Sequence, residues 1–172
     1  MCVICYTNNN NISDEDLKKM WDANPDGAGF AYISEGKAHY SKGFLKYTDF
    51  LDALPEDRTY LMLHFRIATH GLVNACNTHP FDISHPEQIS GSTKRLFFHN
   101  GIFPVNWVVK KSDSAKLSDT YLLARDILAH VKHKNVYDAI LADAGSRFAL
   151  FDASLSKDRW YLYGDWREHK GM

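Results

Sequence analysis

The sequence predicts an α+β fold in which antiparallel sheets and helices pack in layers. The predicted elements follow one another as strand, helix, hairpin, helix, strand, hairpin-like turn, two helices and a final hairpin, an order typical of this class. The length of 172 residues and the 45% of hydrophobic residues suffice for one core. We therefore expect a single domain over residues 1–172.

The first elements are a strand, a capped helix and a hairpin. Residues 2–7 (CVICYT) have the composition of a strand. Ser13, followed three residues later by Asp16, forms an acidic variant of the capping box that begins a helix. The apolar residues of that helix share one face, namely Leu17, Met20 and Trp21. Two strand-like segments then flank a turn at 34–36, which predicts a hairpin.

The middle of the chain predicts a short helix and a buried strand. Residues 47–54 (YTDFLDAL) form an amphipathic helix that Pro55 ends. The strand at 59–66 (TYLMLHFR) leads directly into a polar loop at 67–81. Loops that follow buried strands are common positions for catalytic residues.

The segment 94–103 (KRLFFHNGIF) reads as two strand pieces that meet in a tight turn at Asn100-Gly101. Four further elements follow: helices over 118–131 and roughly 135–142, then the two strands of a terminal hairpin over 147–153 and 159–164.

The composition excludes several classes of partner. The formal net charge is −1 and the Lys and Arg residues are scattered, so we expect no nucleic-acid partner. The apolar stretches are short and interrupted by charges, and no signal peptide is recognisable, so we expect no membrane association and a cytoplasmic location.

The three cysteines predict reduced thiols rather than disulfides. Cys2 and Cys5 are separated by an odd number of positions in a strand, which directs their side chains to opposite faces. We expect Cys5 and Cys76 to be small buried hydrophobic residues. Cys2 is either an inert residue of an N-terminal strand or a nucleophile.

A nucleophilic Cys2 requires a base, because the thiolate is the reactive form. If Met1 is removed, the freed α-amine has a pKa of about 7.7–8.0 and accepts a proton near neutrality, directly or through one water. Cysteine is small enough that aminopeptidases generally permit removal of the preceding Met.

Several short motifs accompany Cys2. They are HFRIATHG at 64–71, NTHPF at 77–81, HNG at 99–101 and SDT at 118–120. In this order, over about residues 2–152, the chain resembles the glutaminase domain of class II glutamine amidotransferases, which are N-terminal nucleophile (Ntn) hydrolases. The resemblance implies a four-layer αββα sandwich of two antiparallel sheets flanked by helices. It also implies an enzyme that hydrolyses the side-chain amide of glutamine through a thioester on Cys2, without cofactor or metal.

The resemblance assigns the oxyanion hole to Asn100 and Gly101. The Asn100 side-chain amide and the Gly101 backbone N–H would stabilise the negative charge that forms when Cys2 attacks the amide. The alternative is that Asn100-Gly101 is only a hairpin turn.

The resemblance also assigns the substrate site. Arg66 would bind the α-carboxylate of glutamine in a bidentate fork, with Thr69 and His70 beside it in the same loop. Asp119 would pair with the α-ammonium, although Asp119 is also a candidate helix N-cap. Asn77 is expected to brace the loop.

His79 is likewise expected to brace this loop rather than to catalyse. His130 and His133 stand at helical spacing but lack a zinc motif, so we expect no metal site.

Two residues and the length of the chain depart from the family pattern. Val3 replaces a common glycine, and Ile67 replaces a common tryptophan of a loop that closes over glutamine. The chain has no synthase domain, so a separate acceptor or synthase protein, or simple glutaminase action, is expected. Two alternatives remain open: an Ntn hydrolase that acts on another amide, and a catalytically idle binding or regulatory subunit.

Overall fold

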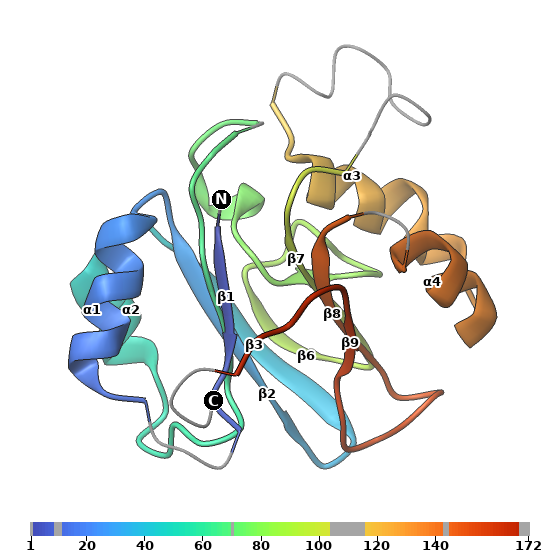
Figure 1. Ribbon diagram of the computed structural model, residues 1–172, viewed down its shortest axis with the longest axis horizontal. Helices are drawn as coiled ribbons and strands as arrows, with labels where there is room; N and C mark the ends of the chain where they lie inside the picture. The colour runs from blue at the N-terminus through green and yellow to red at the C-terminus, as the bar shows by residue number, and fades with distance from the viewer. Residues whose placement is uncertain (1, 9–11, 70, 104–115, 143–144, 169–172) are drawn as a thin grey trace.

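Two antiparallel sheets face each other, and helices cover the outer face of each (Figure 1). The computed structural model describes five stretches of the chain: residues 2–8, 12–69, 71–103, 116–142 and 145–168. Helices α1 (Asp14–Ala23) and α2 (Tyr47–Ala53) cover one sheet, whereas α3 (Asp119–Asp126) and α4 (Lys134–Leu141) cover the other. The predicted α+β class with antiparallel sheets is confirmed.

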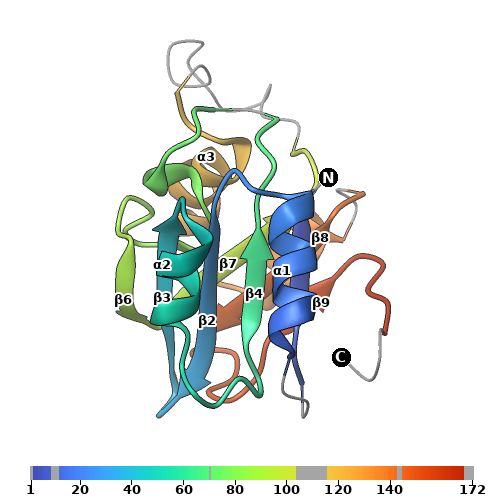
Figure 2. The same ribbon diagram turned by 90° about the vertical axis from the view of Figure 1, so that its left-hand side faces the viewer.

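The first sheet has the strand order β1–β4–β2–β3–β6. Its strands are β1 (Val3–Tyr6), β2 (Ala28–Ser34), β3 (Lys37–Phe44), β4 (Met62–Phe65) and β6 (Ser90–Thr93). Figure 2 shows this sheet behind α1 and α2. The predicted hairpin of β2 and β3 is confirmed, and β1 pairs with β4 so that Val3 lies opposite Phe65. This pairing fixes the position at which Cys2 enters the fold.

The second sheet has the strand order β5–β7–β8–β9. Its strands are β5 (Phe81–Asp82), β7 (Arg95–Asn100), β8 (Arg147–Asp152) and β9 (Tyr161–Tyr163). The terminal hairpin expected from the sequence is confirmed as β8 and β9. The chain passes from the first sheet to the second at Lys94, between β6 and β7.

Three apolar layers hold the sheets and helices together. The side chains of β1 divide between two of them, because Val3 and Cys5 face α1 and α2 whereas Ile4 and Tyr6 face the second sheet. The layer between the sheets is built from both, and includes Ala31, Tyr40, Met62, Leu96, Phe98 and Phe151. The third layer packs β7 and β8 against α3 and α4.

The predicted start of α1 is confirmed. The Ser13 hydroxyl oxygen accepts a hydrogen bond from the Asp16 N–H at 3.1 Å, which satisfies one donor of the first turn. Leu17 and Trp21 are buried on the face that the sequence pattern indicated.

The helix predicted over 118–131 is too long. α3 ends at Asp126, and a short 3₁₀ turn follows at Leu128–His130. The guanidinium of Arg95 donates to the Leu128 carbonyl oxygen at 2.6 Å and to two more carbonyl groups of the same segment. A continuing α-helix would need these oxygens for its own N–H groups. Among the described residues, no helix is both long and apolar enough to cross a membrane.

Strands β5 and β6 are not predicted by the sequence. β6 has the sequence SGST and is largely exposed, so it carries no alternation of apolar residues. It forms because β3 offers its backbone groups along the edge, where Tyr40 pairs with Gly91.

All three cysteines are free. Cys5 is half-buried against the helices, on the face opposite to that of Ile4 and Tyr6. Cys76 is exposed on the 3₁₀ turn Ala75–Asn77, so the expectation that it is buried is wrong.

Lys42 is a buried cation of β3. Its ammonium donates to the carbonyl oxygens of Pro86 at 2.9 Å and Cys76 at 3.2 Å, and it lies 4.0 Å from the centre of the Phe81 ring. Burial lowers the pKa of Lys42 from 10.5 to about 7, against the opposing influence of Glu87 and other nearby charges.

We predict that Lys42 makes the protein more stable as the pH rises above 7. Between pH 7 and 10.5 the unfolded chain holds a proton on this lysine that the folded chain lacks, so raising the pH favours folding. Denaturant titrations from pH 7 to 9 are expected to show a free energy of unfolding that rises by up to about 1.4 kcal/mol per pH unit relative to Lys42→Met. Parallel curves for the two proteins would contradict the prediction.

Candidate active site

Cys2 lies at the start of β1, directly beside the end of β4. Its Sγ accepts a hydrogen bond from the Ile67 N–H at 3.4 Å and lies 3.5 Å from the Ile67 carbonyl oxygen. Because Ile4 and Tyr6 face the second sheet, strand alternation directs Cys2 into the space between the two sheets. Val3, one of the departures from the family pattern, packs on the opposite side and stays out of this space.

Asn100 and Gly101 stand at the end of β7. Phe98 packs in the layer between the sheets, so alternation directs Asn100 into the same space as Cys2. The prediction that two strand pieces meet here in a hairpin turn is wrong. β7 ends at Asn100, and residues 101–103 form no strand. Asn100 is only 6% exposed, and its Oδ1 has no hydrogen-bond partner among the described residues. The Asn100 Oδ1 can therefore accept a hydrogen bond from a ligand.

One hydrogen bond ties the end of β7 to the first sheet. The Nε2–H of His64 donates to the His99 carbonyl oxygen at 3.1 Å, since a carbonyl can only accept. His64 in turn lies opposite Ile4 in the pairing of β4 with β1. The strand that carries Cys2 and the strand that carries Asn100 therefore meet at the same end of the sheets.

Gly101 is required at its position by backbone conformation and by contact. Its φ of +153° lies in the range that favours glycine. A Cβ at this position would lie 2.0 Å from the Ser146 Oγ and 3.1 Å from the His99 Nε2. Only glycine allows the backbone at this position to lie so close to Ser146.

Arg66 extends β4 into the loop. Its backbone N–H donates to the Gly27 carbonyl oxygen at 2.8 Å, and its carbonyl oxygen accepts from the Asp26 N–H at 3.0 Å. The side chain is 3% exposed, and Nη1 donates to the Leu72 carbonyl oxygen at 3.1 Å. By alternation with His64, the guanidinium lies on the side that faces the second sheet.

Asp119 is the first residue of α3 and does not cap it. Ser118 is the N-cap, because its hydroxyl oxygen accepts from the Tyr121 N–H at 3.1 Å. The buried Asp119 carboxylate accepts from the Phe103 N–H at 2.7 Å and from the Thr120 N–H at 2.8 Å. The possible capping role of Asp119 is thus assigned to its neighbour.

Loop 66–72 is held from both sides. Asp26 Oδ2 accepts from the Ala68 N–H at 2.8 Å. At Gly71, with φ +72°, a Cβ would lie 2.7 Å from the backbone of Ser118. Thr69 is exposed on this loop, and His70 lies outside the described residues.

Asn77 braces this loop as expected. Its side-chain amide donates to the carbonyl oxygens of Leu72 at 3.0 Å and Lys116 at 2.7 Å, and its Oδ1 accepts from the Ser118 N–H at 2.9 Å. One buried side chain thus fixes the loop that carries Arg66 against the start of the helix that carries Asp119.

Three buried histidines lie behind the site. Burial lowers the pKa of His64 to about 3, that of His99 to about 4, and that of His79 well below its usual value. The ring of His79 stacks on that of His64 with centroids 3.9 Å apart, whereas His99 Nδ1 lies 2.8 Å from Thr120 Oγ1. All three are therefore neutral near pH 7.

Charged groups converge on Cys2. Burial raises the pKa of the Cys2 thiol; the Ile67 N–H and the charge of Arg66 oppose this rise, and the charge of Asp119 adds to it. The thiol is therefore protonated at neutral pH. Any nucleophilic attack by Cys2 requires a base that removes the proton during the reaction.

The sequence missed three residues that shape the site. Asp26 holds the loop at Ala68, Thr120 contacts His99, and Ser146 stands against Gly101. Asp26 follows a proline and precedes a glycine, which indicates a turn but gives no partner. Thr120 belongs to the SDT motif, but the motif assigned it no role, and nothing local to Ser146 points to the site.

In the described stretches, no group of three or more His, Cys, Asp or Glu residues is arranged to hold a metal ion. The sequence matches no protein-family model. No curated protein gives a significant match.

We predict that Asn77→Ala destabilises the protein by about 2–4 kcal/mol, because backbone groups of Leu72, Lys116 and the buried Ser118 lose their hydrogen-bond partner. Chemical denaturation measures this change in the free energy of unfolding. Asn135→Ala on the exposed surface of α4 is the matched control and is expected to change it by less than about 0.5 kcal/mol. Equal effects of the two substitutions would show that Asn77 does not brace the loop.

Proposed function

We propose that this protein is an Ntn-type amide hydrolase of the class II glutamine amidotransferase kind, with Cys2 as nucleophile and glutamine as substrate. One observation carries the proposal: the Cys2 thiol, the buried Arg66 and Asp119 and the end of β7 at Asn100 and Gly101 converge at one end of the two sheets. These segments are far apart in the sequence, and their convergence supports the roles expected from the motifs. The layered arrangement of helices and sheets is compatible with this class.

The proposed reaction begins with proton transfer. Removal of Met1 frees the α-amine of Cys2, which takes the thiol proton as Sγ attacks the amide carbon. The carbonyl oxygen becomes an oxyanion that the Asn100 amide and the Gly101 N–H stabilise. Collapse breaks the C–N bond, the protonated amine donates its proton to the leaving group, and ammonia departs. Water then hydrolyses the γ-glutamyl thioester to glutamate and restores the thiol.

Two charges on the chain complement the zwitterionic end of glutamine. In the proposed complex the Arg66 guanidinium donates to the α-carboxylate, and the Asp119 carboxylate accepts from the α-ammonium. Both side chains are buried, so the low dielectric would strengthen each bond to the substrate. Thr69 and His70 are assigned to the same subsite by the motif.

Exposed apolar side chains near the Cys2 end of the sheets favour the expectation that a separate acceptor or synthase protein binds there. Leu72, Val73 and Ile102 are 53%, 53% and 56% exposed, and they follow Arg66 and Gly101 in the sequence. A partner that covers them would shield the released ammonia from solvent.

Ammonia release from glutamine tests the chemistry. The protein whose intact mass shows loss of Met1 is expected to release ammonia, and Cys2→Ala to lower the rate by about 10³-fold or more, because the thioester cannot form. Cys5→Ala is the matched control, since Cys5 faces the helices, and it is expected to retain activity. Equal rates for the wild-type protein and Cys2→Ala would exclude the proposed nucleophile.

Retention of Met1 together with no turnover of any amide would instead favour the idle binding or regulatory subunit. The Cys2 amine would then stay in a peptide bond, and the base that the thiol needs would be absent.

A second variant tests the substrate. Arg66→Lys is expected to raise KM for glutamine about 10- to 100-fold, because a single ammonium cannot reproduce the bidentate bond to the α-carboxylate. Hydrolysis of 4-aminobutanamide, which lacks that carboxylate, is expected to be the same for both proteins. An unchanged KM for glutamine would favour an Ntn hydrolase of another amide, in which Ile67 beside Cys2 helps to shape a different pocket.

A further inference from the structure

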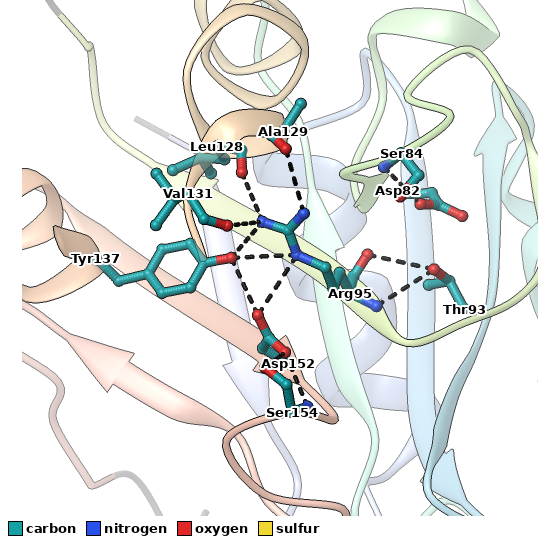
Figure 3. Close-up of polar contacts among 10 residues, drawn as sticks. All are labelled: Asp82, Ser84, Thr93, Arg95, Leu128, Ala129, Val131, Tyr137, Asp152 and Ser154. Carbon is teal, nitrogen blue, oxygen red and sulfur yellow. Dashed lines mark hydrogen bonds and ion pairs between the residues drawn. The ribbon is translucent and has the colours of Figure 1, made fainter. Parts of the chain in front are cut away.

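A fixed polar network lies at the end of the sheets opposite to Cys2. Figure 3 shows Arg95 at its centre, with Nε 3.4 Å from Asp152 Oδ2 and hydrogen bonds to the Tyr137 hydroxyl. The Tyr137 hydroxyl also donates to Asp152 Oδ2 at 3.1 Å. Arg95 further binds the carbonyl oxygens of Leu128 and Val131, so its charge and its donors are engaged within the protein.

A hollow of about 580 Å³ opens beside this network. Four lysines from four separate segments line it: Lys37 after the β2–β3 turn, Lys94 in the connection from β6 to β7, Lys132 after the 3₁₀ turn and Lys157 in the β8–β9 connection. The turns after β2 and β8 both lie at the lower end in Figure 1, away from loop 66–72. None of the residues assigned to the thiol site lines the hollow.

The segments that carry these lysines are held in place. The Lys94 carbonyl oxygen accepts from the Ala153 N–H at 2.8 Å, and Asp152 Oδ1 accepts from the N–H and hydroxyl of Ser154 at 2.9 and 2.6 Å. The stem of Lys157 packs on Gly36, where a Cβ would lie 3.5 Å away. The four ammonium groups are thus gathered by backbone that the core fixes.

The charge of the hollow is unbalanced. Its lining holds two carboxylates, Asp152, which Arg95 engages, and Glu35 in the β2–β3 turn. Within the described part of the chain, none of the four lysines forms an ion pair, although the whole chain has a net charge of −1. Cations concentrated in a concave surface produce a positive potential that attracts anions.

We propose that this hollow is a second binding site, for a small molecule that carries two or more linked phosphate groups. Lysine binds phosphate as a mobile point charge, and several lysines around one ligand match its distributed negative charge. The volume falls in the usual range for small-molecule sites. A single carboxylate would leave most of the lysine charge unbalanced. A nucleic-acid polymer would need a basic surface that continues beyond the hollow.

Calorimetric titration of the full chain with tripolyphosphate and with ATP tests the site. Each is expected to bind saturably at one site, and Lys94→Gln with Lys157→Gln to weaken binding about tenfold or more. The matched control is Lys18→Gln with Lys46→Gln, which removes the same charge from the helical side of the first sheet and is expected to change the affinity less than about twofold. Equal affinity for both ligands identifies the phosphate chain as sufficient, whereas tighter binding of ATP identifies a nucleotide.

Amide chemical shifts locate the bound ligand without any substitution. The signals of Gly36, Ala153 and Ser154 are expected to move on titration, and those of Ile67 and Gly101 to stay unchanged. The absence of saturable binding of either ligand, equal weakening in the two double variants, or tighter binding of an oligonucleotide through the same lysines would overturn the proposal. The titrations do not depend on Cys2, so failure of this site and failure of the amide hydrolase are distinguishable.

Discussion

The antiparallel pairing of β1 with β4 is the constraint on which the rest of the candidate site depends. β1 has four residues at an edge of the first sheet, and its register sets Val3 against Phe65 and Ile4 against His64. With that register fixed, strand alternation sends Cys2 into the space between the sheets and brings its Sγ to the Ile67 N–H. A shift of one residue would turn Cys2 toward α1 and α2 and would turn Cys5 inward. The packing of Ile4 and Tyr6 in the layer between the sheets opposes such a shift.

Buried polar groups make this end of the molecule specific. Asn77, Asp26 and Asp119 each satisfy backbone groups of a segment that lacks regular structure of its own. Such bonds contribute modestly when formed, but the loss of one partner leaves a desolvated group behind, so the network favours one arrangement. The neutral histidines fill the space behind the network without adding charge. Against this background the buried side chains of Arg66 and Asp119 stand out, since both act on the half-buried thiol.

The two ends of the layered fold differ in the surroundings of their cationic side chains. Toward Cys2, a single buried arginine lies within the influence of Asp26 and Asp119. At the opposite end, Arg95 is engaged by Asp152, Tyr137 and backbone carbonyl groups, and the four lysines around it remain at the surface. Arg95 also ends α3 early, so the same contact that anchors the network presents Lys132 at the rim of the hollow. Arg95 thereby determines both where α3 ends and where the charge of Lys132 lies.

The sequence by itself determined the elements whose signals are local. The capping pair Ser13 and Asp16 predicts the start of α1, and alternating apolar residues predict both hairpins, because short-range sterics and hydrogen bonds decide these features. The motifs around Cys2, Arg66, Asn100 and Asp119 also identified the segments that the fold brings together. Only the tertiary structure decided the partners. The polar strand β6 forms on the edge that β3 provides, the carbonyl groups that Arg95 binds end α3, and Ser146 makes Gly101 necessary. Each of these outcomes depends on contacts between residues distant in sequence, and the energy of such a contact is absent until the layers have packed.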